Sequence, residues 1–209
     1  MVATGVGERT LVVVPVKDFG TAKSRLNDTL SRIDRELFAR HCAGRVVAAA
    51  GAHPVLVVTD SPVVASWARS ATLDVVEQRR DGLNGAAHDG RDEARRRGFR
   101  RIAIVHADLP RARSLADVLA HPGDVVIVTD HHGTGTNVLV VDCDVPLEFA
   151  YGRDSCANHI RQARALGLAV ACLEHPELSF DVDDADDYAQ MFATHSPDPA
   201  DRLPEAGEK

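Results

Sequence analysis

The stretch RIAIVHADLP, residues 101–110, decides the fold class, because its apolar part is unbroken. A strand with one face in water alternates apolar and polar residues, whereas residues 102–105 are all apolar. Unbroken apolar runs are typical of strands buried on both faces of a largely parallel sheet. The run leads to Asp108, and the Leu-Pro pair that follows directs the chain away from the sheet. This segment predicts an α/β protein with a carboxylate at one end of its sheet.

Six more apolar runs predict the other strands, at 10–16, 54–60, 73–78, 124–130, 136–142 and 168–174. Helix signals lie between them: Ser31 and Ser61 are N-cap candidates, Pro62 suits the first position of a helix, and Gly51 is a stop. Helical segments are expected at 31–51, 61–70, 84–98, 114–120 and 155–167. This alternation predicts a three-layer α/β sandwich around a mostly parallel sheet.

The 209 residues are expected to form a single domain at 9–194. Residues 1–8 are predicted to be a flexible arm. Residues 195–209 are rich in proline and charge and are predicted to be a disordered tail.

Charge and cysteine usage narrow the class of protein. A net charge of −7 argues against a nucleic-acid partner, because a phosphate backbone would be repelled. No apolar run approaches the ~20 residues of a membrane span, and the first residues lack the basic-then-apolar pattern of a signal peptide. The cysteines form no C-x-x-C pair and are expected to be core residues in a reducing cytoplasm; they are Cys42, Cys143, Cys156 and Cys172.

The stretch FDVDDADDY at 180–188 holds five carboxylates in nine positions. Asp184 stands where an N-cap is expected for the segment ADDYAQMF. Asp186 and Asp187 then fall in the first turn, where the helix dipole favours negative charge. Helix capping therefore accounts for three of the five.

The remaining two carboxylates, Asp181 and Asp183, are candidates for metal binding. Their i, i+2 spacing puts both side chains on one face of an extended segment. Ligands of α/β sheets bind beyond the carboxyl ends of the strands, so Asp108 is expected to lie near them. Three such carboxylates suit Mg²⁺, which usually shares its coordination with substrate phosphates. Taken alone, Asp108 could equally be a turn residue before proline.

The first predicted strand leads into the loop KDFGTAKSRL, residues 17–26. Its Gly20 and its three cations, Lys17, Lys23 and Arg25, give it the outline of a phosphate cradle. The spacing is not that of a P-loop.

Two further glycine-containing stretches have open interpretations. HGTGTNVL at 132–139 is either a hairpin turn or part of a binding loop. YGRDSCANH at 151–159 offers an anion site at a helix start, or simple capping by Asp154 or Ser155. The adjacent His131 and His132 are expected to point apart and make a poor metal pair. His159 could face either way, and no nucleophile arrangement with histidine is found.

Six motifs, in this order, resemble the phospholactate/phosphoenolpyruvate guanylyltransferases of coenzyme F-420 biosynthesis. The resemblance runs from about Leu11 to Phe192 and is carried by PVKDFGTAKSRL, GLNGAAHDG, HADLP, GTGTNVL, YGRDS and DVDDADD. It implies a nucleotide-diphospho-sugar-transferase-like, Rossmann-like fold. It also implies transfer of GMP from GTP to a small phosphorylated carboxylic acid, with release of pyrophosphate.

The resemblance also implies roles for individual residues. Asp108, Asp181 and Asp183 would hold Mg²⁺. Thr136, Gly152 and Ser155 would bind the acceptor acid. Lys17, Lys23 and Arg25 would surround the GTP phosphates and serve catalysis, and Asn84 would lie near the base. Oligomeric state stays open between monomer and homodimer, and the product is expected to pass to the next enzyme of the pathway.

Two departures from the family pattern are small. Ala107 replaces the glycine that often precedes the aspartate of the Asp-Leu-Pro motif, which adds only a methyl group. Asp184 and Ala185 replace a threonine and a proline, and aspartate still caps a helix.

The implied chemistry needs no general base, because the acceptor phosphate is already anionic and can attack the α-phosphorus in line. One alternative is another nucleotidyltransferase of this fold, of molybdopterin or sugar-phosphate type. Those enzymes typically have a glycine-rich, arginine-containing first loop, and here that loop has only Gly20. The other is a nucleotide-binding regulatory domain, which would not need Asp181 and Asp183. Phosphoenolpyruvate, 2-phospholactate and 3-phosphoglycerate all remain candidate acceptors.

Overall fold

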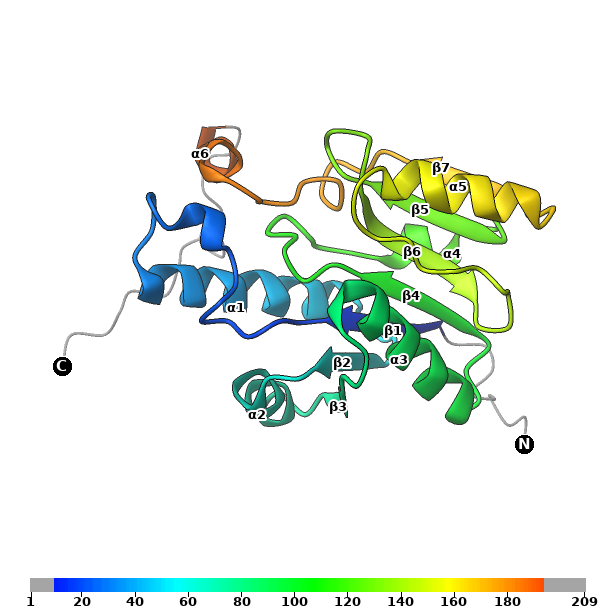
Figure 1. Cartoon of the computed structure of the whole chain (residues 1–209), viewed down its shortest axis with the longest axis horizontal. Helices are drawn as coiled ribbons and strands as arrows, with labels where there is room; N and C mark the ends of the chain where they lie inside the picture. The colour runs from blue at the N-terminus through cyan, green and yellow to red at the C-terminus, as the bar shows by residue number, and fades with distance from the viewer. Residues whose placement is uncertain (1–9, 194–209) are drawn as a thin grey trace.

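A computed structural model describes residues 10–193, which form one seven-stranded sheet with helices on both faces (Figure 1). The tails predicted at 1–8 and 195–209 lie outside the described residues. The strand order is β3-β2-β1-β4-β6-β5-β7. The strands are β1 (Thr10–Pro15), β2 (Val55–Thr59), β3 (Asp74–Glu77), β4 (Arg101–Val105), β5 (Val125–Thr129), β6 (Thr136–Asp142) and β7 (Val170–Leu173). Each falls within a predicted apolar run.

The helices also follow the predicted segments. They are α1 (Arg32–Ala49), α2 (Pro62–Ser70), α3 (Gly82–Arg96), α4 (Ala116–Ala120), α5 (Ser155–Ala165) and α6 (Ala185–Ala193), with a short 3₁₀ helix at Ser24–Leu26. Ser31 and Ser61 cap α1 and α2 as predicted, each accepting a backbone hydrogen bond, and Pro62 is the first residue of α2. No helix within residues 10–193 has the length and apolar character that crossing a membrane would require.

Strand β6 is the exception to the parallel arrangement. It runs antiparallel to both of its neighbours, β4 and β5, whereas the other neighbouring strands are parallel. β5 and β6 thus form a hairpin, and the glycine-containing stretch at 132–139 supplies its turn and the start of β6. The prediction of a mostly parallel sheet is confirmed, and the hairpin interpretation of this stretch is correct.

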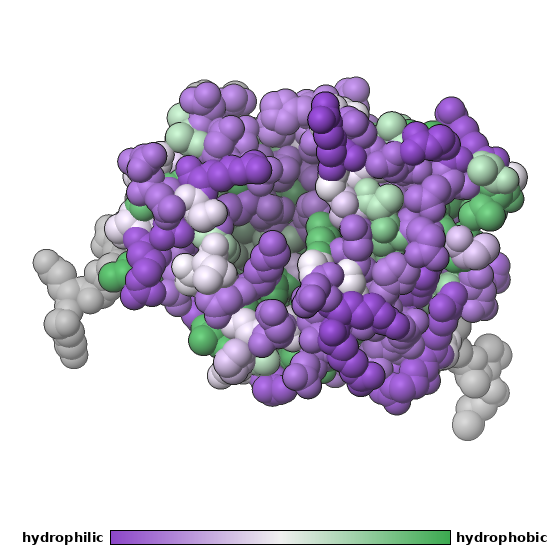
Figure 2. All heavy atoms as spheres, viewed as in Figure 1, coloured by the Kyte–Doolittle hydropathy of each residue, from purple (hydrophilic) through white to green (hydrophobic). Residues whose placement is uncertain are grey.

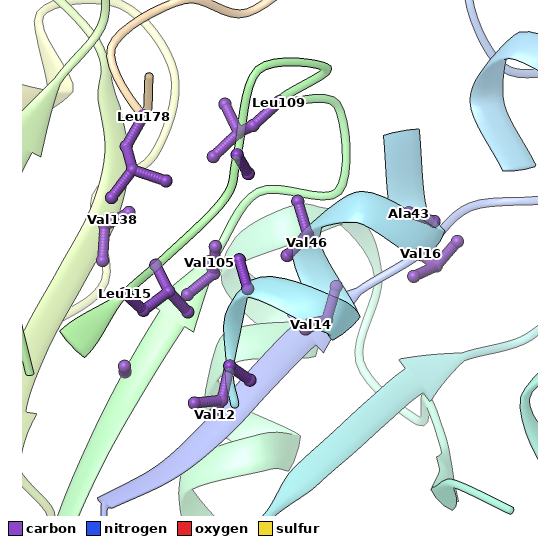
Figure 3. Packing of buried hydrophobic residues seen from close by; sticks show 14 of the residues in the cluster. Val12, Val14, Val16, Ala43, Val46, Val105, Leu109, Leu115, Val138 and Leu178 are labelled. Carbon is purple, nitrogen blue, oxygen red and sulfur yellow. The ribbon is translucent and has the colours of Figure 1, made fainter. Parts of the chain in front are cut away.

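Alternate residues of β1 enter two separate cores, which is what a sheet covered on both faces requires. Val12 and Val14 pack into a core with α1, α2 and α4, part of which Figure 3 shows. Leu11 and Val13 pack into a core with α3 and α5. All four side chains are fully buried. The three-layer sandwich is therefore confirmed.

Helix α3 lies unusually close to β1 at one glycine. A Cβ atom built on Gly90 would lie 2.4 Å from Cγ1 of Val13, far inside van der Waals contact. The helix can approach the strand this closely because residue 90 has no side chain.

A third, smaller apolar cluster joins three segments that carry charged residues. Leu26 from the 3₁₀ helix and Phe180 with Val182 from the acidic stretch pack against Phe38 and Cys42 of α1. Because α1 is anchored in the main core, this cluster fixes the basic loop and the acidic stretch relative to each other.

The cysteine prediction is only partly right. Cys42, Cys143 and Cys156 are buried, but Cys172 is exposed. It belongs to β7, an edge strand that has a sheet neighbour on one side only. An edge position leaves room for solvent that a central strand would exclude.

Candidate functional site

A cleft of about 1020 Å³ lies beyond the ends of the central strands. Nine of the ten predicted site residues line it, namely Lys17, Lys23, Arg25, Asp108, Thr136, Gly152, Ser155, Asp181 and Asp183. Figure 2 shows the face drawn in Figure 1, on which hydrophilic residues predominate and apolar residues are visible between them. The structure thus brings these nine residues into one cleft.

The direction of β6 explains how Thr136 reaches the cleft. Parallel strands β1 and β4 bring their carboxyl ends to this edge of the sheet, followed by the basic loop and by Asp108. β6 runs the opposite way, so it presents its first residue, Thr136, at the same edge. One reversed strand therefore places a hydroxyl beside the ends of the parallel strands.

Lys23 is bound to the acidic side of the cleft. Its Nζ lies 2.7 Å from Oδ2 of Asp108 and 3.7 Å from Oδ1 of Asp183, and it also donates to the carbonyl oxygen of Val182. Burial alone would lower the pKa of Lys23, but Asp108 and Asp183 more than offset this and raise it. The backbone of Lys23 is left-handed, with φ of 56°. Such a conformation in a non-glycine residue is held by its surroundings and is common at functional sites.

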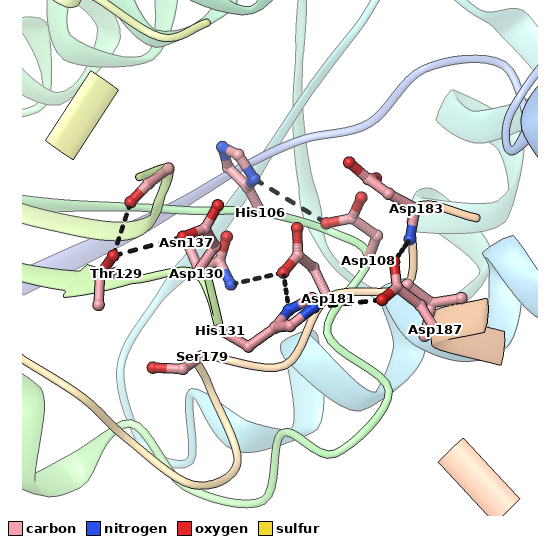
Figure 4. Close-up of polar contacts among 12 residues, drawn as sticks. His106, Asp108, Thr129, Asp130, His131, Asn137, Ser179, Asp181, Asp183 and Asp187 are labelled. Atoms are coloured by element: carbon pink, nitrogen blue, oxygen red, sulfur yellow. Dashed lines mark hydrogen bonds and ion pairs between the residues drawn. The ribbon is translucent and has the colours of Figure 1, made fainter. Parts of the chain in front are cut away.

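The pKa values of Asp108 and Asp181 are shifted in opposite directions. Burial would raise the pKa of Asp108, but the ammonium group of Lys23 outweighs this and lowers it. Asp181 has its pKa raised, first by burial and then by the negative charge of Asp108. Its Oδ1 lies 3.3 Å from Nδ2 of Asn137 and 3.3 Å from Nδ1 of His131 (Figure 4). The charge of Asp181 is therefore less well compensated than that of Asp108.

These carboxylates fit a divalent cation. Oδ1 of Asp108 is buried and accepts no hydrogen bond within residues 10–193; Nδ1 of His106 lies 3.9 Å from it. A buried carboxylate oxygen without a partner is costly, and a metal ion would satisfy it. The raised pKa of Asp181 also indicates a lack of positive charge. The residues thus fit the Mg²⁺ site predicted for Asp108, Asp181 and Asp183.

The acidic stretch is held by a histidine and a buried carboxylate. Nδ1 of His131 lies 3.3 Å from Oδ1 of Asp181, and its Nε2 lies 3.1 Å from Oδ1 of Asp187. Oδ2 of Asp187 in turn accepts a hydrogen bond from the backbone N–H of Asp183 (Figure 4) and a second one from the backbone N–H of Asp184. His131 and Asp187 therefore position the two predicted metal ligands of this stretch.

The expectation for His131 and His132 is wrong. Their rings do not point apart but lie with centroids 3.9 Å apart. Together with Asp187 they form one group of three potential ligands, within the described part of the chain, whose ligand atoms lie within 4.8 Å of one another. The tight turn at residues 131–133 brings the two rings to the same side, which a strand would not. His131 is already engaged with two carboxylates, which gives it a structural reason to be there.

Asp184 caps α6 as predicted, because its Oδ1 accepts from the N–H groups of Asp186 and Asp187. Asp187 does more than balance the helix dipole, since it closes a reciprocal capping box with Asp184. The signal was present in the sequence: Asp187 stands three residues after the cap. Its burial, with 4% exposure, was not predicted.

The basic loop is shaped by Asp18, which the sequence did not single out. Oδ1 of Asp18 accepts from the N–H of Gly20, and its Oδ2 accepts from the hydroxyl of Ser61 at the start of α2. The two remaining predicted cations of this loop, Lys17 and Arg25, are exposed at the cleft. Arg25 has an exposed pair with Asp183 at 3.6 Å, whereas Lys23 is largely buried against its carboxylate partners.

The predicted acceptor residues lie deeper. Thr136 is 1% exposed and Ser155 is 2% exposed, yet both line the cleft. Gly152 has φ of 120°, a value that favours glycine. The side chain of Asp154 makes no capping hydrogen bond to α5. Simple capping by Asp154, one of the two interpretations, is therefore not observed.

Asn84 is the predicted site residue that does not line the cleft. Its side-chain amide donates to the carbonyl oxygen of Tyr151 and accepts from the N–H of Tyr151, at 3.2 and 2.7 Å. Its neighbours Gly82 and Leu83 do line the cleft. In this structure Asn84 holds the backbone beside Gly152 instead of facing the cleft.

Sequence reasoning left the orientation of His159 open, and the structure resolves it. The side chain is fully buried, with Nδ1 3.1 Å from Oγ1 of Thr136 and Nε2 2.9 Å from the backbone nitrogen of Ala150. Burial, with a smaller effect of His106, lowers the pKa of His159 to about 4. Cys156, His159 and Ala163 are all buried on α5, so helical spacing contained the signal.

Comparison with known proteins agrees with this geometry. A family model described as "Guanylyl transferase CofC like" matches residues 10–200. A phosphoenolpyruvate guanylyltransferase of Rubrobacter xylanophilus is 34% identical over 190 residues, covering 87% of this chain and 93% of that protein. A 2-phospho-L-lactate guanylyltransferase of Methanothermobacter thermautotrophicus is 30% identical over 190 residues, covering 88% and 84%.

The fold is shared with a solved structure of a putative nucleotide-diphospho-sugar transferase from Desulfovibrio desulfuricans G20. The TM-score is 0.75 at 16% identity, covering 93% of this chain and 90% of the other. The sheet, the order of the motifs and the match over residues 10–200 lead to one conclusion. The chain is a member of the CofC-like guanylyl transferase family.

Proposed function

We propose that this protein transfers GMP from GTP to a small phosphorylated carboxylic acid, phosphoenolpyruvate or 2-phospho-L-lactate, in coenzyme F-420 biosynthesis. The names of its relatives support both acids. The observation that carries the proposal is one cleft in which exposed cations, converging carboxylates and buried neutral donors meet. A triphosphate, a divalent cation and a small acid need these three kinds of group.

The reaction is a displacement at phosphorus. A phosphate oxygen of the acid forms a bond to the α-phosphorus of GTP, while the bond from that phosphorus to the bridging oxygen of pyrophosphate breaks. Pyrophosphate leaves with the bonding electrons, and no proton has to be removed. The protein must therefore hold two anions in line and offset their repulsion.

The described residues divide this work. In this proposal Lys17 and Arg25, which line the cleft, bind the triphosphate, and Thr136 and Ser155, which also line it, bind the acid. Mg²⁺ held by the predicted carboxylates would neutralise charge on the phosphates. Neutral donors suit the acid, because added fixed cations would bind substrate and transition state alike. The product contains a new phosphoric anhydride bond, so a group-transfer enzyme is expected to use it next.

A pyrophosphate-release assay tests the proposal. GTP, CTP and ATP are each combined with phosphoenolpyruvate, 2-phospho-L-lactate or 3-phosphoglycerate, with and without Mg²⁺. GTP with one of the first two acids should release pyrophosphate only when Mg²⁺ is present. Pyrophosphate release from CTP or ATP instead of GTP would favour another nucleotidyltransferase of this fold. GTP binding without release under any condition would favour the regulatory alternative.

Two matched variants test the carboxylate assignment. Asp181→Asn should abolish the Mg²⁺-dependent release while its melting temperature holds or rises, because removing a charge relieves repulsion. Asp186→Asn removes the same charge from an exposed position outside the cleft and should leave turnover near that of the wild type. Equal loss in both variants would contradict the assignment.

A further inference from the structure

The hydrogen bonds around His159 fix the position of its proton. The backbone nitrogen of Ala150 lies 2.9 Å from Nε2 of His159, and a backbone N–H can only donate. Nε2 must therefore accept and carries no proton. In a neutral imidazole the proton then sits on Nδ1, and this ring nitrogen is a donor.

This tautomer sets the direction of the next hydrogen bond. Nδ1 of His159 lies 3.1 Å from Oγ1 of Thr136, so the imidazole donates and the hydroxyl oxygen accepts. The ring is fully buried, and burial lowers its pKa to about 4, which keeps it neutral at pH 7. Within residues 10–193 this is the one hydrogen bond made by the Thr136 side chain.

The hydroxyl hydrogen of Thr136 is thereby directed away from His159. Thr136 lines the cleft, so this hydrogen is available there as a donor. With the opposite tautomer the hydroxyl would donate to the ring and turn only lone pairs toward the cleft, which an anion would avoid. The tautomer of a buried histidine thus decides whether this side chain attracts or repels a small acid.

We propose that His159 is a positioning residue that presets Thr136 as a hydrogen-bond donor for the phosphorylated acid. The inference rests on the proposed function for the identity of the ligand. It assigns no step of the chemistry to His159, which does not line the cleft. Hydrogen bonds also hold the backbone beside the ring. His159 accepts from the backbone N–H of Ala150, and Asn84 bonds both backbone groups of the next residue, Tyr151.

Two amide substitutions separate the two nitrogens of the ring. An asparagine amide can take the place of Nδ1 and a glutamine amide that of Nε2. His159→Asn retains a donor for Thr136 but loses the acceptor for Ala150, and His159→Gln does the reverse. Both place a neutral amide in the same buried position, so each is the control for the other.

The readout is binding of phosphoenolpyruvate and of 2-phospho-L-lactate, measured by calorimetry with Mg²⁺, together with kcat/KM for each acid. His159→Gln should weaken binding and kcat/KM on the order of tenfold, the effect of one hydrogen bond to an anion. His159→Asn should stay within about threefold of the wild type. KM for GTP at saturating acid should hardly change in either.

A double-mutant cycle shows whether His159 acts through Thr136. In a Thr136→Val background, His159→Gln should weaken acid binding less than about twofold further. Equal losses in the Gln and Asn variants, or an undiminished loss in the Val background, would overturn the inference.

A direct check does not depend on turnover. Nitrogen-15 chemical shifts of labelled histidines, with His159 assigned by its loss in His159→Gln, should show a neutral ring protonated on Nδ1. A ring protonated on Nε2 in an active enzyme overturns this inference alone. The expected tautomer in a protein that binds neither acid overturns the proposed function, and with it the ligand of Thr136.

Discussion

At the scale of single residues, Lys23 controls the charge balance of the acidic side of the cleft. Its ammonium group contacts Asp108, lies near Asp183 and donates to a carbonyl between the two predicted ligands Asp181 and Asp183. Sequence reasoning assigned all three loop cations to the phosphates of GTP. A side chain on a loop can reach several partners, so only the folded structure shows which anion Lys23 meets.

Lys23→Met should destabilise the metal-free protein by roughly 2–4 kcal/mol, because it leaves carboxylates uncompensated in a largely buried place. Mg²⁺ should then raise the melting temperature of the variant more than that of the wild type. Arg25→Met is the control, since its exposed pair with Asp183, at 3.6 Å, should be worth at most about 1 kcal/mol. Equal destabilisation by both substitutions would contradict this role.

His159 predicts a defined loss of stability in acid. Burial lowers its pKa from the ordinary value of 6.5 to about 4 in the folded protein, so between these pH values the unfolded chain binds more protons than the folded one. Above pH 6.5 the ring is neutral in both states, and the free energy of unfolding keeps its full value. As the pH falls toward 4, the unfolded chain takes up the proton first, and the free energy of unfolding decreases. The loss amounts to about 2–3 kcal/mol near pH 4.5.

Urea unfolding at pH 7 and pH 4.5, for wild type and His159→Gln, measures this contribution. Carboxylates titrate in both proteins, so their effect on the free energy of unfolding is removed when the acid-induced loss of the variant is subtracted from that of the wild type. If the variant loses as much stability in acid as the wild type, His159 is not the group responsible.

At the scale of elements, the close approach of α3 to β1 depends on Gly90. Gly90→Ala should lower the free energy of unfolding by about 1–3 kcal/mol, because its Cβ would overlap the side chain of Val13. The higher helix propensity of alanine, at most about 1 kcal/mol, offsets part of this loss.

Gly44 on α1 is the matched control. A Cβ there has no atom within 4 Å, so Gly44→Ala should stabilise the protein by about 0.5–1 kcal/mol. Chemical denaturation of both variants checks the pair. A stabilising Gly90→Ala would mean that α3 can shift without cost.

The elements also show what the sequence could predict. Apolar, β-branched runs identified all seven strands, and the five inner strands are the most continuous because both of their faces are buried, whereas the edge strands β3 and β7 are partly exposed. The direction of β6 could not be read, since TNVLVVD has the same pattern in either orientation. That direction places Thr136 at the cleft. The one indication of this direction was the stretch at 132–139, for which a hairpin turn was one of the two interpretations left open.

Site residues divide in a similar way. Thr136 begins β6 and Asp108 follows the end of β4 by three residues, so topology largely fixes their place, and both line the cleft. Asn84 lies within α3, where a small rotation decides between cleft and backbone, and it contacts Tyr151 instead. The partnership of His131 with Asp181 spans fifty positions of the chain and depends on tertiary packing alone.

At the scale of the whole molecule, the cleft has a gradient of burial from rim to floor. Lys17 and Arg25 are exposed, whereas Thr136 and Ser155 are 1% and 2% exposed. A triphosphate on the rim cations would cover the way to the floor. This depth difference has a kinetic consequence: the two substrates should add in a fixed order, the acid first and GTP second.

Inhibition patterns reveal such an order. Because Lys17 and Arg25 are exposed in the empty enzyme, GTP can also bind there first and block the acid, so at low acid the rate should fall at high GTP, and added acid should relieve this inhibition. A rate that reaches a plateau in GTP at every acid concentration would mean that either substrate can enter first. Under compulsory order, GTP that is abundant relative to the acid holds the enzyme in an unproductive complex. The depth of two small side chains would thus tie the use of GTP to the supply of its partner.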